Sequence, residues 1–195
     1  SKFIALLVVA GGCILLGMGM PTLPAYVTVA AIALPSMQAL GMEPLAAHMF
    51  VFMIAVASTI TPPVAIAAYA AAAISGGRPI ATAVAASRIG CMVFLIPFAF
   101  AYEPLLLTVS QAGGDFTWPR YVMLLSQLVL SIYVLASALI GFDKSTLPWY
   151  QVITRLTACI LMFSADTQLE WLGIAIAIMT LIHTHFLVTK TETER

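Results

Sequence analysis

The chain has 195 residues, of which 62% are hydrophobic and only 8% are charged, and its formal net charge is +0. Soluble domains usually carry about 25% charged residues, and a soluble fold of this size could not hide so much apolar surface. The composition therefore indicates an integral protein of the lipid bilayer, and it excludes nucleic acid as a partner, because that partner requires a basic surface.

Long stretches of the sequence carry no formal charge. They lie between Lys2 and Glu43, between Glu43 and Arg78, between Arg120 and Asp143, and between Glu170 and Lys190. A membrane-spanning helix needs about 20 apolar residues, so most of these stretches can hold one. Because the apolar runs are continuous rather than alternating, we expect an all-α fold, a polytopic helical bundle in a membrane.

The first two apolar runs, residues 3–16 and 24–40, are separated by a segment rich in glycine. Each run is shorter than a full span, and Gly17 and Gly19 between them permit unusual backbone angles. We expect a re-entrant hairpin over residues 3–40, in which Pro21 and Thr22 start the returning arm. One continuous kinked helix is the alternative.

The next segment, residues 44–75, is too long for one straight span. It contains Ser58, Thr59 and Thr61, followed directly by Pro62 and Pro63. Two consecutive prolines remove two backbone donors and clash with the preceding turn, so we expect a discontinuous helix that is broken near Thr61. The break should expose backbone carbonyl groups beside three hydroxyl side chains.

Four further helices are expected, at residues 83–110, 121–141, 150–163 and 169–188, followed by a polar tail at 190–195. If the hairpin returns to its own side and each later helix crosses once, most basic residues fall on one side of the membrane. These residues are Arg78, Arg88, Lys144, Arg155, Lys190 and Arg195. Lys2 and Arg120 fall on the other side, so the positive-inside rule predicts a cytoplasmic C-terminus.

Two interrupted membrane segments that are close in sequence are typical of a transport site. Carbonyl oxygens of unwound backbone suit a cation such as sodium, and the positive ends of half-helices suit a carboxylate. The candidate cation- and substrate-binding residues are Gly17, Gly19, Pro21, Thr22, Ser58, Thr59, Thr61, Pro62 and Pro63. Sodium is expected at four of these, Gly17, Gly19, Thr59 and Thr61.

Two other interpretations of these residues remain open. The glycines could allow close helix packing, and the hydroxyl groups could bind only the local helix backbone. The protein would then be a membrane scaffold or assembly subunit of a larger complex. An enzyme is not expected, because the sequence contains no G-x-S-x-G, H-E-x-x-H or P-loop motif. No cofactor is expected apart from sodium as a coupling ion.

The same interruptions carry a family resemblance. The matching strings are GMGMPT at 17–22, PAYV at 24–27, EPLAAHMFVF at 43–52, TPPVA at 61–65 and IPFAF at 96–100. They resemble the fused-permease branch of the tripartite ATP-independent periplasmic (TRAP) transporters, which is typically paired with TAXI-type binding proteins. The resemblance is strong over about residues 11–106.

The resemblance implies the C-terminal part of the large, DctM-like permease subunit in a bacterial inner membrane. Residues 1–112 would be the C-terminal portion of a transport domain that works by an elevator mechanism, and residues 113–195 would add further helices and a cytoplasmic tail. Sodium would drive import of a small organic anion, often a carboxylate, that a periplasmic binding protein delivers. Since the chain begins with Ser1, we expect an upstream remainder that carries an inverted repeat of both interruptions.

Overall fold

The structure is a computed structural model that describes residues 2–108, 116–143, 145–163 and 167–193. Contacts divide the chain into two compact units, residues 1–121 and 122–195. The regular secondary structure of the described residues is helical apart from one two-residue β ladder, which confirms the predicted helical class. Residues 79–102 and 118–140 are long and apolar enough to cross a membrane, judged by length and composition.

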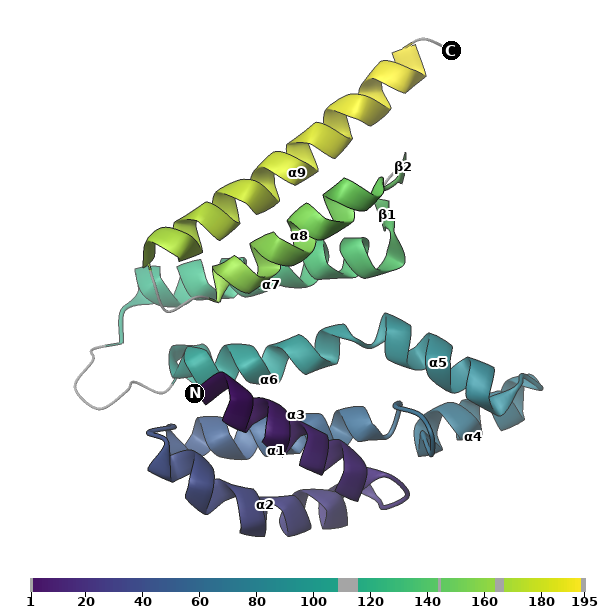
Figure 1. The fold of residues 1–195 in the computed structure, drawn as a ribbon, viewed down its shortest axis with the longest axis vertical. Helices are drawn as coiled ribbons and strands as arrows, with labels where there is room; N and C mark the ends of the chain where they lie inside the picture. The colour runs from purple at the N-terminus through teal and green to yellow at the C-terminus, as the bar shows by residue number, and fades with distance from the viewer. Residues whose placement is uncertain (1, 109–115, 144, 164–166, 194–195) are drawn as a thin grey trace. The chain divides into compact units, whose positions relative to one another are not determined.

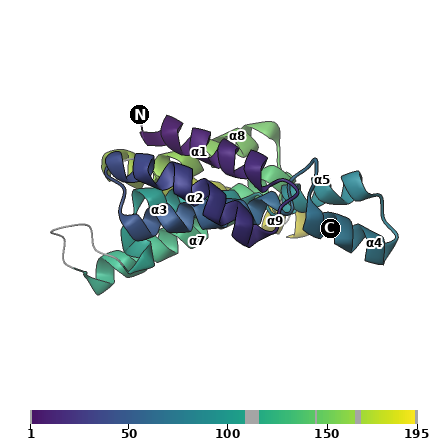
Figure 2. The same cartoon turned by 90° about the horizontal axis from the view of Figure 1, so that it is seen from below.

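The first unit consists of short helices joined by tight turns (Figure 1). They are α1 (Lys2–Gly17), α2 (Thr22–Ala39), α3 (Pro44–Ser58), α4 (Ile66–Ser75), α5 (Pro79–Ile89), α6 (Met92–Tyr102) and the 3₁₀ helix η1 (Pro104–Leu107). Helix α3 is central: it packs against α1, α2 and α6, whereas α4 packs against α5. Figure 2 shows α4 and α5 side by side from a second direction.

Helices α1 and α2 form a hairpin that packs against α3. The buried residues of α1 recur at helical spacing, at Leu6, Ala10, Cys13 and Gly17, so that one stripe of the helix faces the core. This stripe joins a cluster that includes Phe50 of α3. The two arms therefore have a core to pack on. Their entry into a membrane from one side remains a prediction.

Helix α3 begins with a strong capping arrangement. The Glu43 side chain accepts a hydrogen bond from the Ala46 backbone N–H at 3.0 Å, and Pro44 occupies the first turn, where its missing donor is harmless. Further along, the Tyr26 hydroxyl of α2 is hydrogen-bonded to His48 Nδ1 at 2.7 Å. These contacts fix the start of α3 and tie the returning arm of the hairpin to it.

The predicted helix over residues 83–110 is wrong in three respects. Helix α5 already begins at Pro79, the helix is interrupted between Ile89 and Met92, and α6 ends at Tyr102. The end follows from Pro104, since a proline disfavours helical backbone at the residue before it. The predicted end at residue 110 lies outside the described residues.

The second unit is built from three helices and a short ladder. They are α7 (Trp118–Ile140, whose first turn belongs to the first unit), β1 (Phe142–Asp143), β2 (Ser145–Thr146), α8 (Trp149–Met162) and α9 (Thr167–Thr193). Val134 of α7, Met162 of α8 and Ala177 of α9 share one buried cluster. Helix α9 is longer than predicted and includes the polar tail up to residue 193.

A buried arginine lies at the centre of the second unit. The Arg155 side chain is 0% exposed and forms an ion pair with Asp143 at 2.7 Å. It also donates to the Thr184 hydroxyl at 2.9 Å and to the Ser137 hydroxyl. Arg155 therefore joins α7, β1, α8 and α9. Because its charge is paired inside the second unit, the prediction that counts Arg155 among the basic residues that orient the protein is corrected.

Further polar side chains extend this network on both sides. The Tyr133 hydroxyl donates to Asp143 at 2.8 Å. The Thr184 hydroxyl contacts Gln151 Oε1 at 3.2 Å, and Gln151 is in turn hydrogen-bonded to His183 at 3.0 Å. We call these side chains the Arg155 network: Tyr133, Ser137, Asp143, Gln151, Arg155, His183 and Thr184.

Candidate functional site

The first interruption is a four-residue turn between the arms of the hairpin. Helix α1 ends at Gly17, and α2 begins at Thr22 with Pro21 as its N-cap, where the returning arm is predicted to start. Gly19 has a φ of 83°, a left-handed backbone that favours glycine. The Met20 backbone N–H closes the turn by donating to the Gly17 carbonyl at 3.4 Å. The glycine pattern therefore corresponds to a real reversal of the chain.

The second interruption separates α3 from α4. Helix α3 ends at Ser58, α4 begins at Ile66, and the Pro62–Pro63 peptide bond between them is cis. Ala65, the N-cap of α4, has a φ of 34°, a left-handed conformation that is uncommon for a residue with a side chain. The interruption therefore contains the two prolines and the position near Thr61 that the sequence predicts.

The structure brings the two interruptions together. A Cβ atom placed on Gly17 would lie 2.5 Å from Ser58 Oγ and 3.0 Å from Ser58 Cβ, so only glycine fits against that serine. At Gly19, a Cβ atom would lie 3.7 Å from Val64 Cγ1, in ordinary contact. Gly17 is buried and Ser58 is only 2% exposed, so their contact is close and dry.

The other predicted site residues are more exposed than Gly17 and Ser58. Gly19, Pro21 and Pro63 are exposed, whereas the other four are half-buried: Thr22, Thr59, Thr61 and Pro62. Among the described residues, no group of three or more His, Cys, Asp or Glu side chains could hold a metal ion. A cation bound here would therefore depend on uncharged oxygen atoms of the backbone and hydroxyl groups.

The three hydroxyl groups of the second interruption bind the end of α3. Ser58, Thr59 and Thr61 each donate to a carbonyl three or four residues earlier, at 2.7, 2.8 and 2.7 Å. This is the local hydrogen bonding that the alternative interpretation expects. A hydroxyl oxygen that donates its hydrogen keeps its lone pairs, so it can still serve as an acceptor or a cation ligand.

Several carbonyl groups expected to be bare have donors within the protein. The carbonyls of Thr59 and Thr61 accept backbone N–H groups at 3.0 and 3.2 Å, and the Ile60 carbonyl accepts the Ser87 hydroxyl at 2.8 Å. The Pro63 carbonyl accepts a tyrosine hydroxyl. The expectation of bare carbonyls is therefore wrong at these four positions, although a carbonyl has two lone pairs and each keeps one free for a ligand.

Sequence reasoning missed two residues that support the second interruption. Ser87 of α5 donates to the Ile60 carbonyl, and a Cβ atom on Gly90 would lie 2.5 Å from Ile60 Cδ1. Gly90 lies between α5 and α6, so the kink there contacts the interruption directly. Gly90 within an apolar run was the available signal. Its contact partner lies 30 residues earlier, which local sequence patterns do not show.

We expect Gly90→Ala to lower the free energy of unfolding by about 1–3 kcal/mol, because overpacking of a tight contact forces its neighbours to move. Ile60→Val removes only the Cδ1 atom at 2.5 Å, so the double variant should recover part of the loss. Gly11→Ala is the control, since no heavy atom lies within 4 Å of a Cβ atom there. Thermal unfolding in detergent measures all four proteins. Equal stability of Gly90→Ala and wild type would contradict the packing described.

A comparison with known protein families gives one match, and it covers most of the first unit. The family model described as "Tripartite ATP-independent periplasmic transporter, DctM component" matches residues 1–112, more than half of the chain. No curated protein and no solved structure matches the chain. The matched residues include both interruptions and all helices from α1 to η1, whereas α7, α8, α9 and the Arg155 network lie outside.

Proposed function

Because the chain belongs to the DctM family of tripartite ATP-independent periplasmic transporter components, we propose that it uses a sodium gradient to import a small organic anion. Membership in this family makes the protein a permease component of a transporter and not an enzyme. It is a multi-pass inner-membrane protein that works with an extracytoplasmic binding protein. The coupling ion, the carboxylate chemistry of the substrate and the residues that bind them are our proposal.

The contact between Gly17 and Ser58 carries this proposal. It holds the turn of the hairpin against the end of α3, and this supports the proposal that oxygen atoms of both interrupted segments reach one ligand. Sodium is a hard cation that prefers oxygen ligands. We assign it to the hydroxyl oxygens of Thr59 and Thr61, together with backbone oxygens at Gly17 and Gly19.

The starts of α2 and α4 supply the complementary charge for an anion. A helix N-terminus carries a partial positive charge and backbone N–H groups that have no partner within the helix, and both favour a carboxylate. One of these groups in α4, the Ala67 N–H, already donates to the Thr59 carbonyl at 3.0 Å. Thr22 is the first residue of α2, with Pro21 before it, and Pro62 and Pro63 precede the start of α4. We assign the substrate carboxylate to these two helix starts, next to the sodium ion.

The remaining features of the transport cycle rest on the sequence resemblance. Residues 1–112 would be the C-terminal portion of a moving transport domain in an elevator mechanism, with an inverted upstream repeat as its second half-site. Residues 113–195 would be additional helices ending at a cytoplasmic C-terminus. A TAXI-type binding protein would deliver the carboxylate. When Arg155 is left out of the count, more basic residues still fall on the side that is proposed to be cytoplasmic than on the other side.

Uptake by the full-length permease in proteoliposomes tests the proposal. We expect uptake of a carboxylate substrate only when an inward sodium gradient and the binding protein are both present. Uptake that is indifferent to sodium would contradict the coupling ion, and uptake that is indifferent to the binding protein would contradict the delivery step.

Thr61→Ala should raise the sodium concentration for half-maximal uptake by about tenfold, since an interaction with a charged group contributes about 1.5–3 kcal/mol. Thr82→Ala is the matched control, because Thr82 also donates its hydroxyl to a carbonyl four residues earlier but lies near the start of α5 and is not among the predicted site residues. The sodium dependence of both variants should be measured side by side. An unchanged sodium requirement in Thr61→Ala would remove Thr61 from the site.

A membrane scaffold or assembly subunit is the second candidate. It is favoured by the internal hydrogen bonds of the second interruption, where three hydroxyls and four carbonyls already have partners. Under this alternative the two interruptions only pack. Thr61→Ala and Thr59→Ala would then leave uptake by the assembled transporter unchanged.

A further inference from the structure

All three tryptophans of the chain lie at the beginnings of helices in residues 118–193. Trp118 is the first residue of α7, Trp149 is the first residue of α8, and Trp171 lies in the second turn of α9. Their exposed fractions are 70%, 75% and 54%. Tryptophan is enriched where the membrane meets water, because its large ring is apolar and its N–H group needs a polar partner.

Other aromatic rings accompany two of these tryptophans. Phe116 and Tyr121 surround Trp118, with ring centroids 5.3 and 6.2 Å from the indole. At the other end of α7, past the β ladder, Tyr150 lies 6.4 Å from Trp149. Aromatic rings, most of them exposed, are thus gathered at the start of α7 and at the start of α8, which follows the other end of α7.

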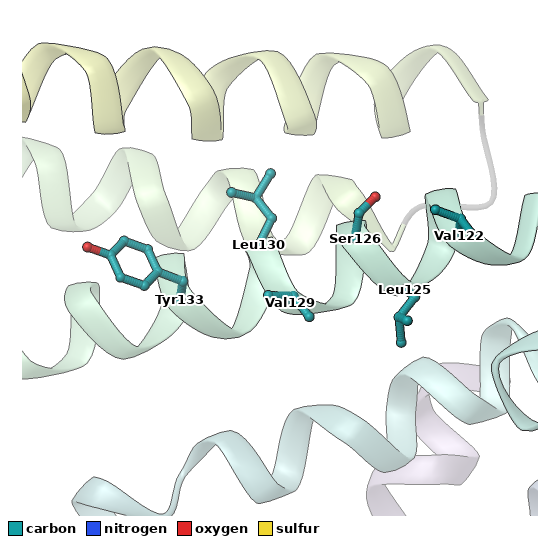
Figure 3. A pocket seen from close by; sticks show the side chains of 6 residues that line it. All are labelled: Val122, Leu125, Ser126, Val129, Leu130 and Tyr133. Atoms are coloured by element: carbon teal, nitrogen blue, oxygen red, sulfur yellow. The ribbon is translucent and has the colours of Figure 1, made fainter. Parts of the chain in front are cut away.

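The length of α7 fits the distance between two membrane boundaries, and one of its sides carries apolar side chains. It has 23 residues, which at 1.5 Å per residue is about 33 Å, close to the roughly 30 Å of a bilayer's hydrocarbon layer. Side chains of α7 line an open apolar hollow on one side of the helix (Figure 3). It is lined by Val122, Leu125, Ser126, Val129, Leu130 and Tyr133.

Within the second unit the helices alternate in direction (Figure 1). Helix α8 runs back from the end of α7, and α9 begins again near the end where α7 starts. Trp149 therefore lies toward one end of this helix group and Trp171 toward the opposite end, from which α7 continues back to Trp118.

We propose that these aromatic rings form two belts that contact the headgroup layers of a phospholipid bilayer. Trp118 and Trp171 mark one boundary, and Trp149 marks the other. The inference does not depend on the transported substrate or the coupling ion. Arg155 follows Trp149 by six residues, about 9 Å along α8, so the backbone of Arg155 would lie below the boundary and its side chain pairs with Asp143 of the β ladder. Charged groups at such depth are tolerated when they face the interior of a bundle and are paired.

Depth-dependent fluorescence quenching tests the belts. Three single-tryptophan proteins are made by replacing the other two tryptophans with phenylalanine, and each is reconstituted in phosphatidylcholine liposomes. The lipids carry bromine either near the headgroup end or near the terminus of the acyl chains. The reference is Val129→Trp in a tryptophan-free background, because Val129 is exposed and lies in the middle of α7.

We expect the shallow bromines to quench Trp118, Trp149 and Trp171 at least about twofold more strongly than the deep ones, and the order to be reversed at position 129. A shallow–deep–shallow profile along α7 and α8 would support two boundaries. Stronger quenching of Trp118 or Trp149 by deep bromines would overturn the proposal. Quenching of either residue by aqueous iodide with no quenching by brominated lipid would also overturn it, because the ring would then lie in water.

Discussion

Replacing Arg155 by methionine is expected to lower the free energy of unfolding by about 3–5 kcal/mol, the effect of breaking a buried ion pair from one side. The guanidinium group is 0% exposed and pairs with Asp143 at 2.7 Å. Without it, the buried carboxylate loses its ion-pair partner in a surrounding of low dielectric constant. The hydroxyl groups of Ser137 and Thr184 would lose a charged donor in the same step.

The matched comparison replaces both charges. Asp143→Leu with Arg155→Met removes the ion pair as a whole, and such exchanges are often neutral or stabilising. We therefore expect the double variant to be more stable than Arg155→Met alone. Denaturant unfolding followed by circular dichroism in detergent measures both. A loss of less than about 1 kcal/mol in Arg155→Met would show that the pair contributes no more than a surface salt bridge does.

Replacing Gly17 by valine is expected to reduce sodium-driven uptake by about a hundredfold, the order of loss that follows a displacement of about 1 Å in a binding geometry. The new Cβ atom would lie 2.5 Å from Ser58 Oγ and 3.0 Å from Ser58 Cβ, closer than atoms approach without movement. The turn of the hairpin must then move away from the end of α3. A sodium ion held by oxygen atoms of both interruptions, as proposed, would then lose part of its binding site.

Gly12 provides the control for this variant. It lies in the same helix, and no heavy atom lies within 4 Å of a Cβ atom there, so Gly12→Val should keep uptake within about twofold of wild type. Initial uptake rates in proteoliposomes, corrected for the amount of folded permease, are the measurement. Equal losses in the two variants would point to a general effect of β-branched residues in α1 rather than to the contact with Ser58.

Local chemistry explains which parts of the first unit could be predicted. Two adjacent prolines cannot continue a helix, and the structure breaks the helix at Pro62 and Pro63. A glycine-rich segment between two apolar runs favours a turn, and Gly19 adopts the backbone that makes it. Both features depend on only a few neighbouring residues, so the sequence alone indicates them.

The contacts between these segments were not predictable in the same way. The sequence suggested a common site from two nearby interruptions, but only the fold shows that Gly17 lies against Ser58. The interruption at Gly90 was missed, and the Ile60 side chain that requires glycine there lies 30 residues earlier in the sequence. Similarly, bare carbonyls were expected near Thr61, whereas Ser87 of another helix supplies one of the missing donors.

In the second unit, the partner of a buried charged residue could likewise not be predicted from the sequence. Arg155 was counted as a charge at the membrane edge, because a lone arginine within an apolar helix gives no indication of its partner. The partner, Asp143, lies in a two-residue strand that apolar patterns do not reveal. Gly141, with a φ of 72°, allows the turn that brings this strand back against α8.

A double-mutant cycle tests most directly whether the two interruptions act as one site. Gly17→Ala, Ser58→Gly and the combination are compared with wild type in the full-length permease, by the sodium concentration that gives half-maximal uptake. Ser58→Gly removes the two atoms that the new methyl group would approach too closely, Ser58 Oγ and Ser58 Cβ. Residues in contact usually show an interaction energy of about 0.5–3 kcal/mol. We therefore predict that the double variant needs several-fold less sodium than the product of the single effects implies. Effects that multiply without interaction would contradict a shared site.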